Sequence, residues 1–318
     1  MPVAILDDYQ GAALNYADWS AAKTKVQAFN EHIADRGKLA KTLADFEIVV
    51  AMRERTPFDR ELFAKLPKLK LLVTTGMRNA AIDLEAASAH GVMVCGTEGA
   101  AHPTAELAWG LIISCLRKIP FENAELRRGG RWQNSVGGDL NGKRLGVIGL
   151  GRLGSRVARV GKAFEMNVLA WSKHLTRERC IAAGAELAPS LDDVLRTSDI
   201  VTIHLVLSER TRGLIGAREL GLMKPTAYLI NTSRGPIVDE RALIAALQQG
   251  RIAGAGLDVF DEEPLPAAHP FRTLDNVVAT PHLGYVSEDT YRIFYGQALE
   301  DVIAWLSGKP MRVLNPGK

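Results

Sequence analysis

The chain has 318 residues, of which 47% are hydrophobic and 24% charged, and its formal net charge is +3. This length and composition are typical of a globular protein with room for two domains. The small net charge argues against a nucleic-acid binder that works by neutralising phosphates. The longest nearly apolar run, residues 107–116, has about half of the length that spans a membrane, so no membrane partner is expected.

The three cysteines, Cys95, Cys115 and Cys180, form an odd and widely spaced set with no C-x-x-C and no histidines at ligand spacing. Each is expected to be a buried thiol in a reducing compartment, and no metal site is expected. The first residues lack the basic and apolar regions of a signal peptide. We therefore expect a cytoplasmic, metal-free protein.

Short apolar runs alternate with helical segments in the first hundred residues and predict a small α/β unit with buried parallel strands. Its clearest helix is expected to begin at Thr56 as the N-cap, with Pro57 in the first turn and Asp59 completing the cap. That helix ends before Pro67. The expected strands cover residues 3–6, 48–51, 69–74 and 92–95.

A strand over residues 145–148 runs directly into a glycine turn of the form G-x-G-x-x-G, and a helix follows. This context is the one that dinucleotide binding requires. Gly149 would make the tight turn, Gly151 would let backbone N–H groups approach a pyrophosphate, and Gly154 would let the helix pack closely. The phosphates would lie at the positive end of the helix dipole. The apolar residues expected on one face of this helix are Leu153, Val157, Val160 and Phe164.

An apolar helix over residues 104–119 precedes the glycine turn, and further strand and helix signals follow it. One of the later helices begins with a capping box at Ser190. Six strands with crossovers predict a doubly wound parallel sheet that binds its ligand at the carboxyl ends of the strands. A long helix over residues 287–306 comes last. The five strands expected after the turn cover residues 168–171, 200–205, 227–231, 254–259 and 277–280.

Polar residues follow three consecutive strands of this sheet: Arg234, the acidic run at residues 261–263, and His282. Each alone has an ordinary interpretation as a solvated surface residue, but their joint placement favours catalysis. Reduction of a 2-oxo acid needs a cation that holds the carboxylate and polarises the carbonyl, and Arg234 suits both tasks. It also needs an acid for the developing alkoxide, which His282 provides. A carboxylate such as Glu263 would stabilise the imidazolium and keep it protonated near neutral pH.

Five motifs together resemble the D-isomer-specific 2-hydroxyacid dehydrogenases, the family that includes glyoxylate/hydroxypyruvate reductases and phosphoglycerate dehydrogenase. They are VIGLGRLG (147–154), HLVLSERTRGLI (204–215), INTSRGPIVDE (230–240), GLDVFDEEP (256–264) and PHLG (281–284). The resemblance covers nearly the whole chain. It implies a Rossmann-type NAD(P)-binding domain, residues 101–286. This domain would be inserted into a smaller flavodoxin-like α/β substrate domain made of residues 1–100 and 287–318.

The same resemblance implies roles for individual residues. Arg234 would bind the substrate carboxylate, His282 would be the acid/base and Glu263, the acid before the proline, its partner. Family members are usually dimers joined through the cofactor domain, including a helix like residues 104–119. The implied substrate contacts are Arg53, Gly76, Met77, Arg78 and Arg234, with the 75–78 loop offering backbone N–H groups. The implied cofactor contacts are Gly149, Gly151, Arg152, Leu153, Gly154, Ser172, Lys173, His204, Thr232, Asp258 and Gly284.

Two departures from the family pattern bear on specificity. Arg78 stands in the substrate loop, where it either favours an anionic or larger polar substrate or points to solvent. The second departure is at Ser172, where a carboxylate normally binds both ribose hydroxyls of NAD. With Lys173, Arg177 and Arg179 close behind, the serine predicts NADP(H); the alternative is that it tolerates NAD.

The sequence therefore predicts an NAD(P)H-dependent reductase that converts a small 2-oxo acid, such as glyoxylate or hydroxypyruvate, into the D-2-hydroxy acid. One alternative is a dinucleotide-sensing co-repressor on the same scaffold, which would act by binding a partner. Another keeps the enzyme class but acts on formate or phosphonate. A turnover screen of 2-oxo acids with both cofactors distinguishes these interpretations.

Overall fold

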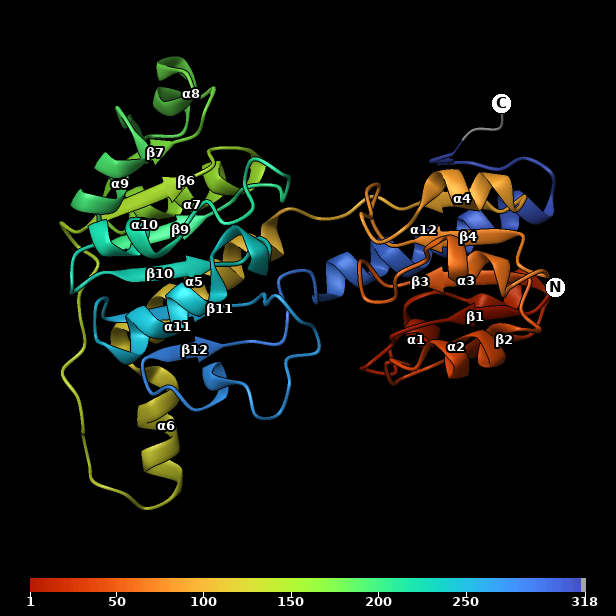
Figure 1. Cartoon of the computed structure of the whole chain (residues 1–318), viewed down its shortest axis with the longest axis horizontal. Helices are drawn as coiled ribbons and strands as arrows, with labels where there is room; N and C mark the ends of the chain where they lie inside the picture. The colour runs from red at the N-terminus through yellow and green to blue at the C-terminus, as the bar shows by residue number, and fades with distance from the viewer. Residues whose placement is uncertain (316–318) are drawn as a thin grey trace. The chain divides into compact units, whose positions relative to one another are not determined.

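The structure is a computed structural model that describes residues 1–315. The chain divides into two compact units, one made of residues 1–100 with the segment from Ser287 onward, the other of residues 101–286. Each unit is built on one sheet whose neighbouring strands run parallel, with helices between successive strands (Figure 1). This arrangement confirms the predicted α/β class.

The first unit has the strand order β2-β1-β3-β4-β5, which is the order of flavodoxin-like sheets. Helices α2, α3 and α4 supply one apolar core with the strands, and α12 packs on β4 and β5. The strands are β1 (Val3–Ile5), β2 (Val26–Ala28), β3 (Ile48–Ala51), β4 (Leu71–Thr74) and β5 (Met93–Gly96). The helices are α1 (Ala13–Tyr16), the 3-10 turn η1 (Trp19–Ala22), α2 (Arg36–Leu43), α3 (Arg60–Ala64), α4 (Leu84–Ala89) and α12 (Glu288–Leu306).

The four strands expected in this unit are present, but two local predictions were incomplete. Strand β2 was missed because it is short and not fully buried, so its apolar pattern is weak. The predicted cap of α3 was wrong: Asp59 is the N-cap, and its carboxylate accepts a hydrogen bond from the Leu62 amide at 2.9 Å. The Thr56 hydroxyl is buried and instead donates to Asp7 Oδ2 at 2.7 Å.

The second unit has the strand order β12-β11-β10-β9-β6-β7-β8. The order reverses at β6, which lies between β7 and β9, and such a switch point is where doubly wound sheets bind ligands. All six predicted strands are present, and the short β8 was missed. The strands are β6 (Arg144–Ile148), β7 (Asn167–Trp171), β8 (Glu186–Leu187), β9 (Ile200–Ile203), β10 (Tyr228–Asn231), β11 (Gly254–Leu257) and β12 (Val277–Ala279).

Both faces of this sheet are covered, because successive residues of a strand point to opposite sides. Leu229 belongs to the core under α9, α10 and α11, whereas Ile230 belongs to the core under α5 (His102–Arg117) and α7 (Arg152–Ala163). The strands are therefore apolar without alternation, as expected for buried parallel strands. The remaining elements are α8 (Arg177–Ala182), α9 (Leu191–Thr197), α10 (Ala217–Leu222), α11 (Glu240–Gln248) and the 3-10 turns η2 (Gly235–Ile237) and η3 (Pro270–Arg272).

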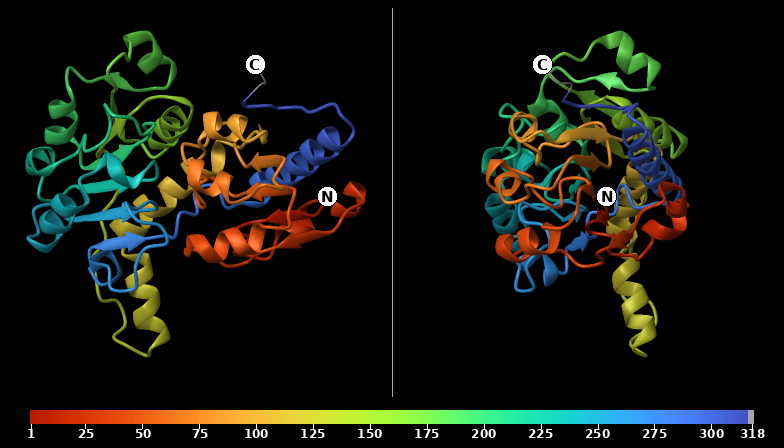
Figure 2. Two further views of the ribbon diagram at one scale, coloured as in Figure 1. Left: turned by 45° about the vertical axis from the view of Figure 1, so that its right-hand side comes forward. Right: turned by 90° about the vertical axis from the view of Figure 1, so that its right-hand side faces the viewer.

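The helix predicted over residues 104–119 is α5 (His102–Arg117), and a second helix, α6 (Ile119–Arg127), follows it. Lys118 separates them with a left-handed backbone, φ +49°. Within its unit, α6 extends away from the sheet in both views of Figure 2. No helix in the part of the chain that the structure describes is long and apolar enough to cross a membrane.

Helix α7 (Arg152–Ala163) follows the glycine turn as predicted, and its predicted apolar face is only partly buried. Val157 is buried, whereas Val160 and Phe164 are 40% and 39% exposed. The helix approaches the sheet through small residues, and a Cβ on Gly161 would lie 2.8 Å from Leu145 Cδ2. The remaining buried positions of α7 are Gly154 and Ala158.

The three cysteines are unpaired and buried, as predicted. Burial raises the pKa of the Cys95 and Cys115 thiols to about 12, so both stay protonated at neutral pH. Of the capping box predicted at Ser190, the N-cap half is confirmed, because Ser190 caps α9 by accepting the Asp193 amide. The Asp193 carboxylate accepts the Ser190 hydroxyl at 2.6 Å instead of the Ser190 amide.

Candidate active site

The glycine turn between β6 and α7 has the backbone geometry that a dinucleotide site needs. Gly149 has φ +98°, and a Cβ there would lie 2.5 Å from the carbonyl oxygen of His204. A Cβ on Gly154 would collide with the Gly149 carbonyl. At Gly151, the N-cap of α7, a Cβ would meet no described atom within 4 Å. The turn is therefore closed on the sheet side and open at the helix N-terminus, which fits a bound pyrophosphate.

Ser172 lies beside this turn at the end of β7, because the Gly149 amide donates to the carbonyl of Trp171 at 2.8 Å. Arg179, from α8, reaches the same turn, and its Nη2 donates to the Leu150 carbonyl at 3.2 Å. Lys173 is exposed. Arg152 and Leu153, the other predicted pyrophosphate contacts, are the first two residues of α7. The region that would bind the adenosine ribose thus has a serine and a guanidinium.

Thr232 and His204 follow β10 and β9, on the predicted nicotinamide side of the sheet. The Thr232 hydroxyl is buried and has no hydrogen-bond partner within residues 1–315. His204 Nε2 contacts the Thr202 hydroxyl at 2.9 Å, and its shielded Nδ1 also lacks a partner among these residues. Burial lowers the pKa of His204 to about 4, so its ring is neutral at physiological pH. Buried polar atoms usually have partners, so these two fit a bound polar group such as a nicotinamide cofactor.

Arg234, Glu263 and His282 lie at the carboxyl ends of β10, β11 and β12, which are consecutive neighbours in the sheet. His282 Nδ1 lies 2.6 Å from Glu263 Oε2, and both side chains are largely buried. Glu263 Oε1 accepts the Phe260 amide at 2.9 Å, which orients the carboxylate. A Cβ on Gly235 would collide with the peptide between Phe260 and the next residue, so the Arg234 loop packs directly on the Glu263 turn.

The turn that carries His282 has a strained backbone that Asp258 stabilises. His282 has φ +53°, which is uncommon for a residue other than glycine. Asp258 Oδ1 accepts the Thr280 hydroxyl at 2.7 Å and the Leu283 amide at 2.6 Å, and Oδ2 accepts the Gly284 amide at 2.8 Å. Burial raises the pKa of Asp258, and these donors oppose that rise. Both carboxylate oxygens of this predicted cofactor residue are thus engaged in holding the turn that carries His282.

Gly284, also predicted to bind cofactor, is engaged in the same turn. Its carbonyl accepts a hydrogen bond from the Thr104 hydroxyl at 2.7 Å, and its amide donates one to Asp258. Sequence reasoning did not single out Thr104 or Thr280. Only the position of Thr280, directly before the Pro-His pair at a strand end, was a signal that could have identified it.

In the first unit, the predicted substrate residues gather at the carboxyl ends of β3 and β4. Arg53 has φ +46°, and its Nη1 donates to the Thr75 carbonyl at 3.2 Å. A side chain on Gly76 would collide with this guanidinium, and the Gly76 amide donates to Thr97 Oγ1 at 2.9 Å. The expectation that the Gly76 amide faces substrate is therefore not met by this conformation. Met77 and Arg78 are exposed.

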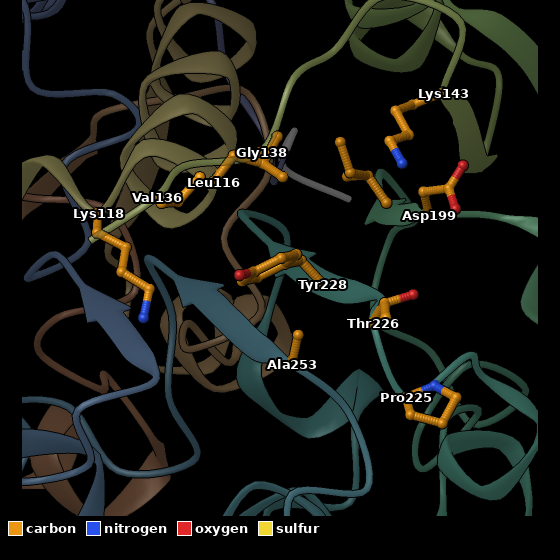
Figure 3. Close-up of a pocket in the computed structure, with 11 residues that line it drawn as sticks. Leu116, Lys118, Val136, Gly138, Lys143, Asp199, Pro225, Thr226, Tyr228 and Ala253 are labelled. Atoms are coloured by element: carbon orange, nitrogen blue, oxygen red, sulfur yellow. The ribbon is translucent and has the colours of Figure 1, made fainter.

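A cavity of about 340 Å³ opens in the second unit at the amino ends of its strands (Figure 3). Tyr228 lies near the middle of its lining, with Lys118 on one side and Lys143 beside Asp199 on another. No predicted site residue lines it. Strands β9 and β10 begin there, whereas the polar groups described above follow their carboxyl ends. The cavity is therefore separate from the candidate active site.

Comparison with known proteins identifies the family. Residues 109–284 match the family model described as "D-isomer specific 2-hydroxyacid dehydrogenase, NAD binding domain". A glyoxylate reductase of Aeropyrum pernix is 41% identical over 267 residues, covering 81% of this chain and 79% of that protein. A D-3-phosphoglycerate dehydrogenase of Methanocaldococcus jannaschii is 38% identical over 258 residues, which cover 80% of this chain but only 49% of that longer protein.

Among solved structures, a putative D-3-phosphoglycerate dehydrogenase oxidoreductase from Ralstonia solanacearum superimposes with a TM-score of 0.95 at 37% identity. That alignment covers 99% of this chain and 97% of the other. The chain therefore belongs to the D-isomer specific 2-hydroxyacid dehydrogenase family. It is an oxidoreductase of that family with a domain for a nicotinamide cofactor.

Proposed function

We propose that this chain reduces a small 2-oxo acid of the glyoxylate or hydroxypyruvate type to the D-2-hydroxy acid. The observation that carries the proposal is the 2.6 Å contact between His282 Nδ1 and Glu263 Oε2. A histidine that directs Nδ1–H to a carboxylate leaves Nε2 for the substrate oxygen. The similarity to glyoxylate reductases supports the same substrate class.

The three polar groups divide the chemistry. The guanidinium of Arg234 holds the substrate carboxylate and polarises the carbonyl. His282 donates a proton from Nε2 to the developing alkoxide, and Glu263 stabilises the imidazolium before the transfer. The hydride for C2 of the substrate would come from a bound nicotinamide cofactor, which the glycine turn, Thr232 and His204 would hold. In the first unit, Arg53 and the backbone at Met77 and Arg78 are the candidates for further contacts with the substrate.

Replacing His282 tests the proposed acid. His282→Ala is expected to lower kcat for glyoxylate reduction by on the order of a hundredfold to ten-thousandfold, because general acid catalysis contributes that much. Cofactor binding, followed by protein fluorescence, is expected to stay close to that of the wild type. Glu262→Gln is the control, since Glu262 is an exposed acid next to Glu263. A variant that retains turnover contradicts the role of His282.

For the cofactor, we propose a preference for NADP(H). Ser172 stands where an acid would repel a 2′-phosphate, and the contact of Arg179 with the Leu150 carbonyl supports a cation at the glycine turn. Lys173 adds an exposed positive charge next to the serine. A serine hydroxyl and a guanidinium are good partners for a phosphate dianion.

The test compares kcat/KM for NADPH and NADH. Ser172→Asp is expected to shift the ratio toward NADH, because the new carboxylate repels the 2′-phosphate and binds the ribose hydroxyls. Arg179→Ala is expected to weaken NADPH binding more than NADH binding. Arg159→Ala is the matched control, because Arg159 is an exposed arginine two turns into α7. A wild-type preference for NADH of tenfold or more would overturn the proposal.

We also propose a homodimer formed through α5, α6 and the segment that follows. Large apolar side chains in this region are exposed, including Trp132 at 75% and Val136 at 97%. Ile119, Phe121 and Leu126 are exposed on α6. Such a concentration of apolar surface is typical of a protein interface.

The three unpaired, buried cysteines are compatible with the reducing cytoplasm, which is our proposed location.

A further inference from the structure

A second histidine–glutamate pair is attached to the loop that carries Glu263. Glu240 is the first residue of α11, and His269 lies in the loop that connects β11 to β12. His269 Nε2 is 3.1 Å from Glu240 Oε1, and both side chains are mostly buried, with exposed fractions of 13% and 21%. The catalytic roles proposed above use neither residue.

The hydrogen bonds define which nitrogen of His269 carries the proton. His269 is the N-cap of η3, and its Nδ1 accepts the Phe271 amide at 3.3 Å. Nδ1 is therefore an acceptor, and the proton resides on Nε2 and is donated to Glu240. The other oxygen of Glu240, Oε2, accepts the Asp261 amide at 3.3 Å. One carboxylate thus binds two points of the β11–β12 loop.

These two points lie on either side of Glu263 in the sequence. Glu263 is two residues after Asp261 and six residues before His269. The peptide between Phe260 and Asp261 is confined on one side by Gly235 and on the other by Glu240. The same stretch presents the Phe260 amide that orients the Glu263 carboxylate. A shift of this stretch would move the carboxylate that holds His282.

We propose that Glu240 and His269 are a positioning pair for the proposed acid/base pair Glu263–His282. This inference rests on the proposed function, because it assigns the two residues to the same proton transfer. They touch neither substrate nor cofactor in this scheme. They act by holding the loop at two points, which keeps Glu263 Oε2 within hydrogen-bond distance of His282.

Other charged groups surround Glu240 and the β11–β12 loop. Asp239, the preceding residue, caps α11 by accepting the Ala242 amide at 2.9 Å. Burial, and then the charge of Glu240, raises the pKa of Asp261, while Arg212 opposes the rise. On the other side of the loop, His282 faces Glu263 and the charge of Asp258. Of these acids, Glu240 is the one that bonds to both the Asp261 amide and His269.

The experiment measures kcat, KM and the pH dependence of glyoxylate reduction in Glu240→Ala and Glu240→Gln, with Glu262→Gln as the charge-matched control. Glu240→Ala is expected to lower kcat on the order of tenfold to a hundredfold while KM changes little, because small misplacement of a catalytic group costs about that much. The decline of the rate with rising pH is expected to begin at a lower pH, since a displaced Glu263 stabilises the imidazolium less. Glu240→Gln keeps the size of the side chain but only one acceptor oxygen, so a smaller loss of the same kind is expected.

His269→Gln retains an N–H donor toward Glu240 and is expected to preserve more of kcat than His269→Ala. If Glu240→Ala fails to fold, Glu240→Gln and the His269 variants decide the question. Variants that lose thermal stability but keep the wild-type kcat and pH profile would show a purely structural pair and overturn the inference. A wild-type chain that reduces no 2-oxo acid is a different failure: it overturns the proposed function, and the positioning role with it.

Discussion

The turn that carries His282 offers a sharp test, because a single carboxylate holds it. Asp258 is fully buried and accepts three hydrogen bonds from Thr280, Leu283 and Gly284. In Asp258→Asn, the one remaining carbonyl oxygen can still accept from Thr280 and Leu283. The new NH₂ group then faces the Gly284 amide, so one acceptor is lost and two donors oppose each other.

The magnitude follows from that lost bond. A hydrogen bond to a buried charged group contributes about 1.5–3 kcal/mol. If the strained backbone at His282 (φ +53°) relaxes, the imidazole moves away from its position. The free energy of the lost hydrogen bond then appears as a higher free energy of the transition state that uses the imidazole. At about 1.36 kcal/mol per factor of ten, kcat/KM for reduction is expected to fall roughly tenfold to 150-fold.

The assay follows the oxidation of NADPH and NADH with glyoxylate and hydroxypyruvate, with cofactor affinity measured separately. Because both oxygens of Asp258 bind the turn, kcat is expected to change more than cofactor affinity. Thr280→Val removes one of the three donors without placing a new donor against Gly284, so a smaller effect is expected. Asp258→Asn activity within twofold of the wild type would refute the reasoning, as would a loss confined to cofactor affinity.

Two further predictions concern stability and assembly. Burial, opposed by Arg312, raises the pKa of Asp301 to about 7, whereas an unfolded aspartate titrates at about 3.9. Between about pH 4 and pH 7, Asp301 therefore holds a proton in the folded chain but not in the unfolded chain. The free energy of unfolding falls as pH rises across that interval, by up to about 1.4 kcal/mol per pH unit. The free energy of unfolding of Asp301→Asn, measured with denaturant, is expected to lack this contribution to the pH dependence. If the wild type and the variant differ by the same free energy of unfolding at every pH, the prediction is contradicted. For the homodimer, light scattering is expected to show twice the chain mass for the wild type and a shift to monomer for Trp132→Ser/Val136→Asp. Ile181→Asp is the control, because Ile181 is 69% exposed on α8, outside the proposed interface. A monomeric wild type would contradict the proposed interface.

The features that the sequence predicts correctly have signals that lie close together along the chain. The glycine turn, the buried strands and the polar residues after β10, β11 and β12 were all predictable. Each depends on a pattern within about ten residues, such as a strand that feeds a Gly-rich turn or an apolar run that ends in Arg234 or His282. The two-part α/β architecture followed from the same local signals.

Contacts between distant residues decided the cap of α3 and the buried part of α7, whereas the missed strands β2 and β8 are short and gave weak local signals. Thr56 does not cap α3, because its hydroxyl bonds Asp7, 49 residues earlier. Val160 and Phe164 stay partly exposed, and α7 approaches the sheet through Gly161, where a Cβ would lie 2.8 Å from Leu145 Cδ2. Periodicity finds the apolar residues of a helix, but the packing partner decides which of them are buried.

The sequence by itself therefore determined the scaffold and the three groups proposed for catalysis, since motif order and strand-end placement are written locally. Only the tertiary structure decided how those groups are held. Asp258 uses both oxygens on the His282 turn, and Glu240 joins α11 to the loop that presents Glu263. These contacts link residues 21 to 26 positions apart, across strands and helices whose relative placement no local pattern specifies.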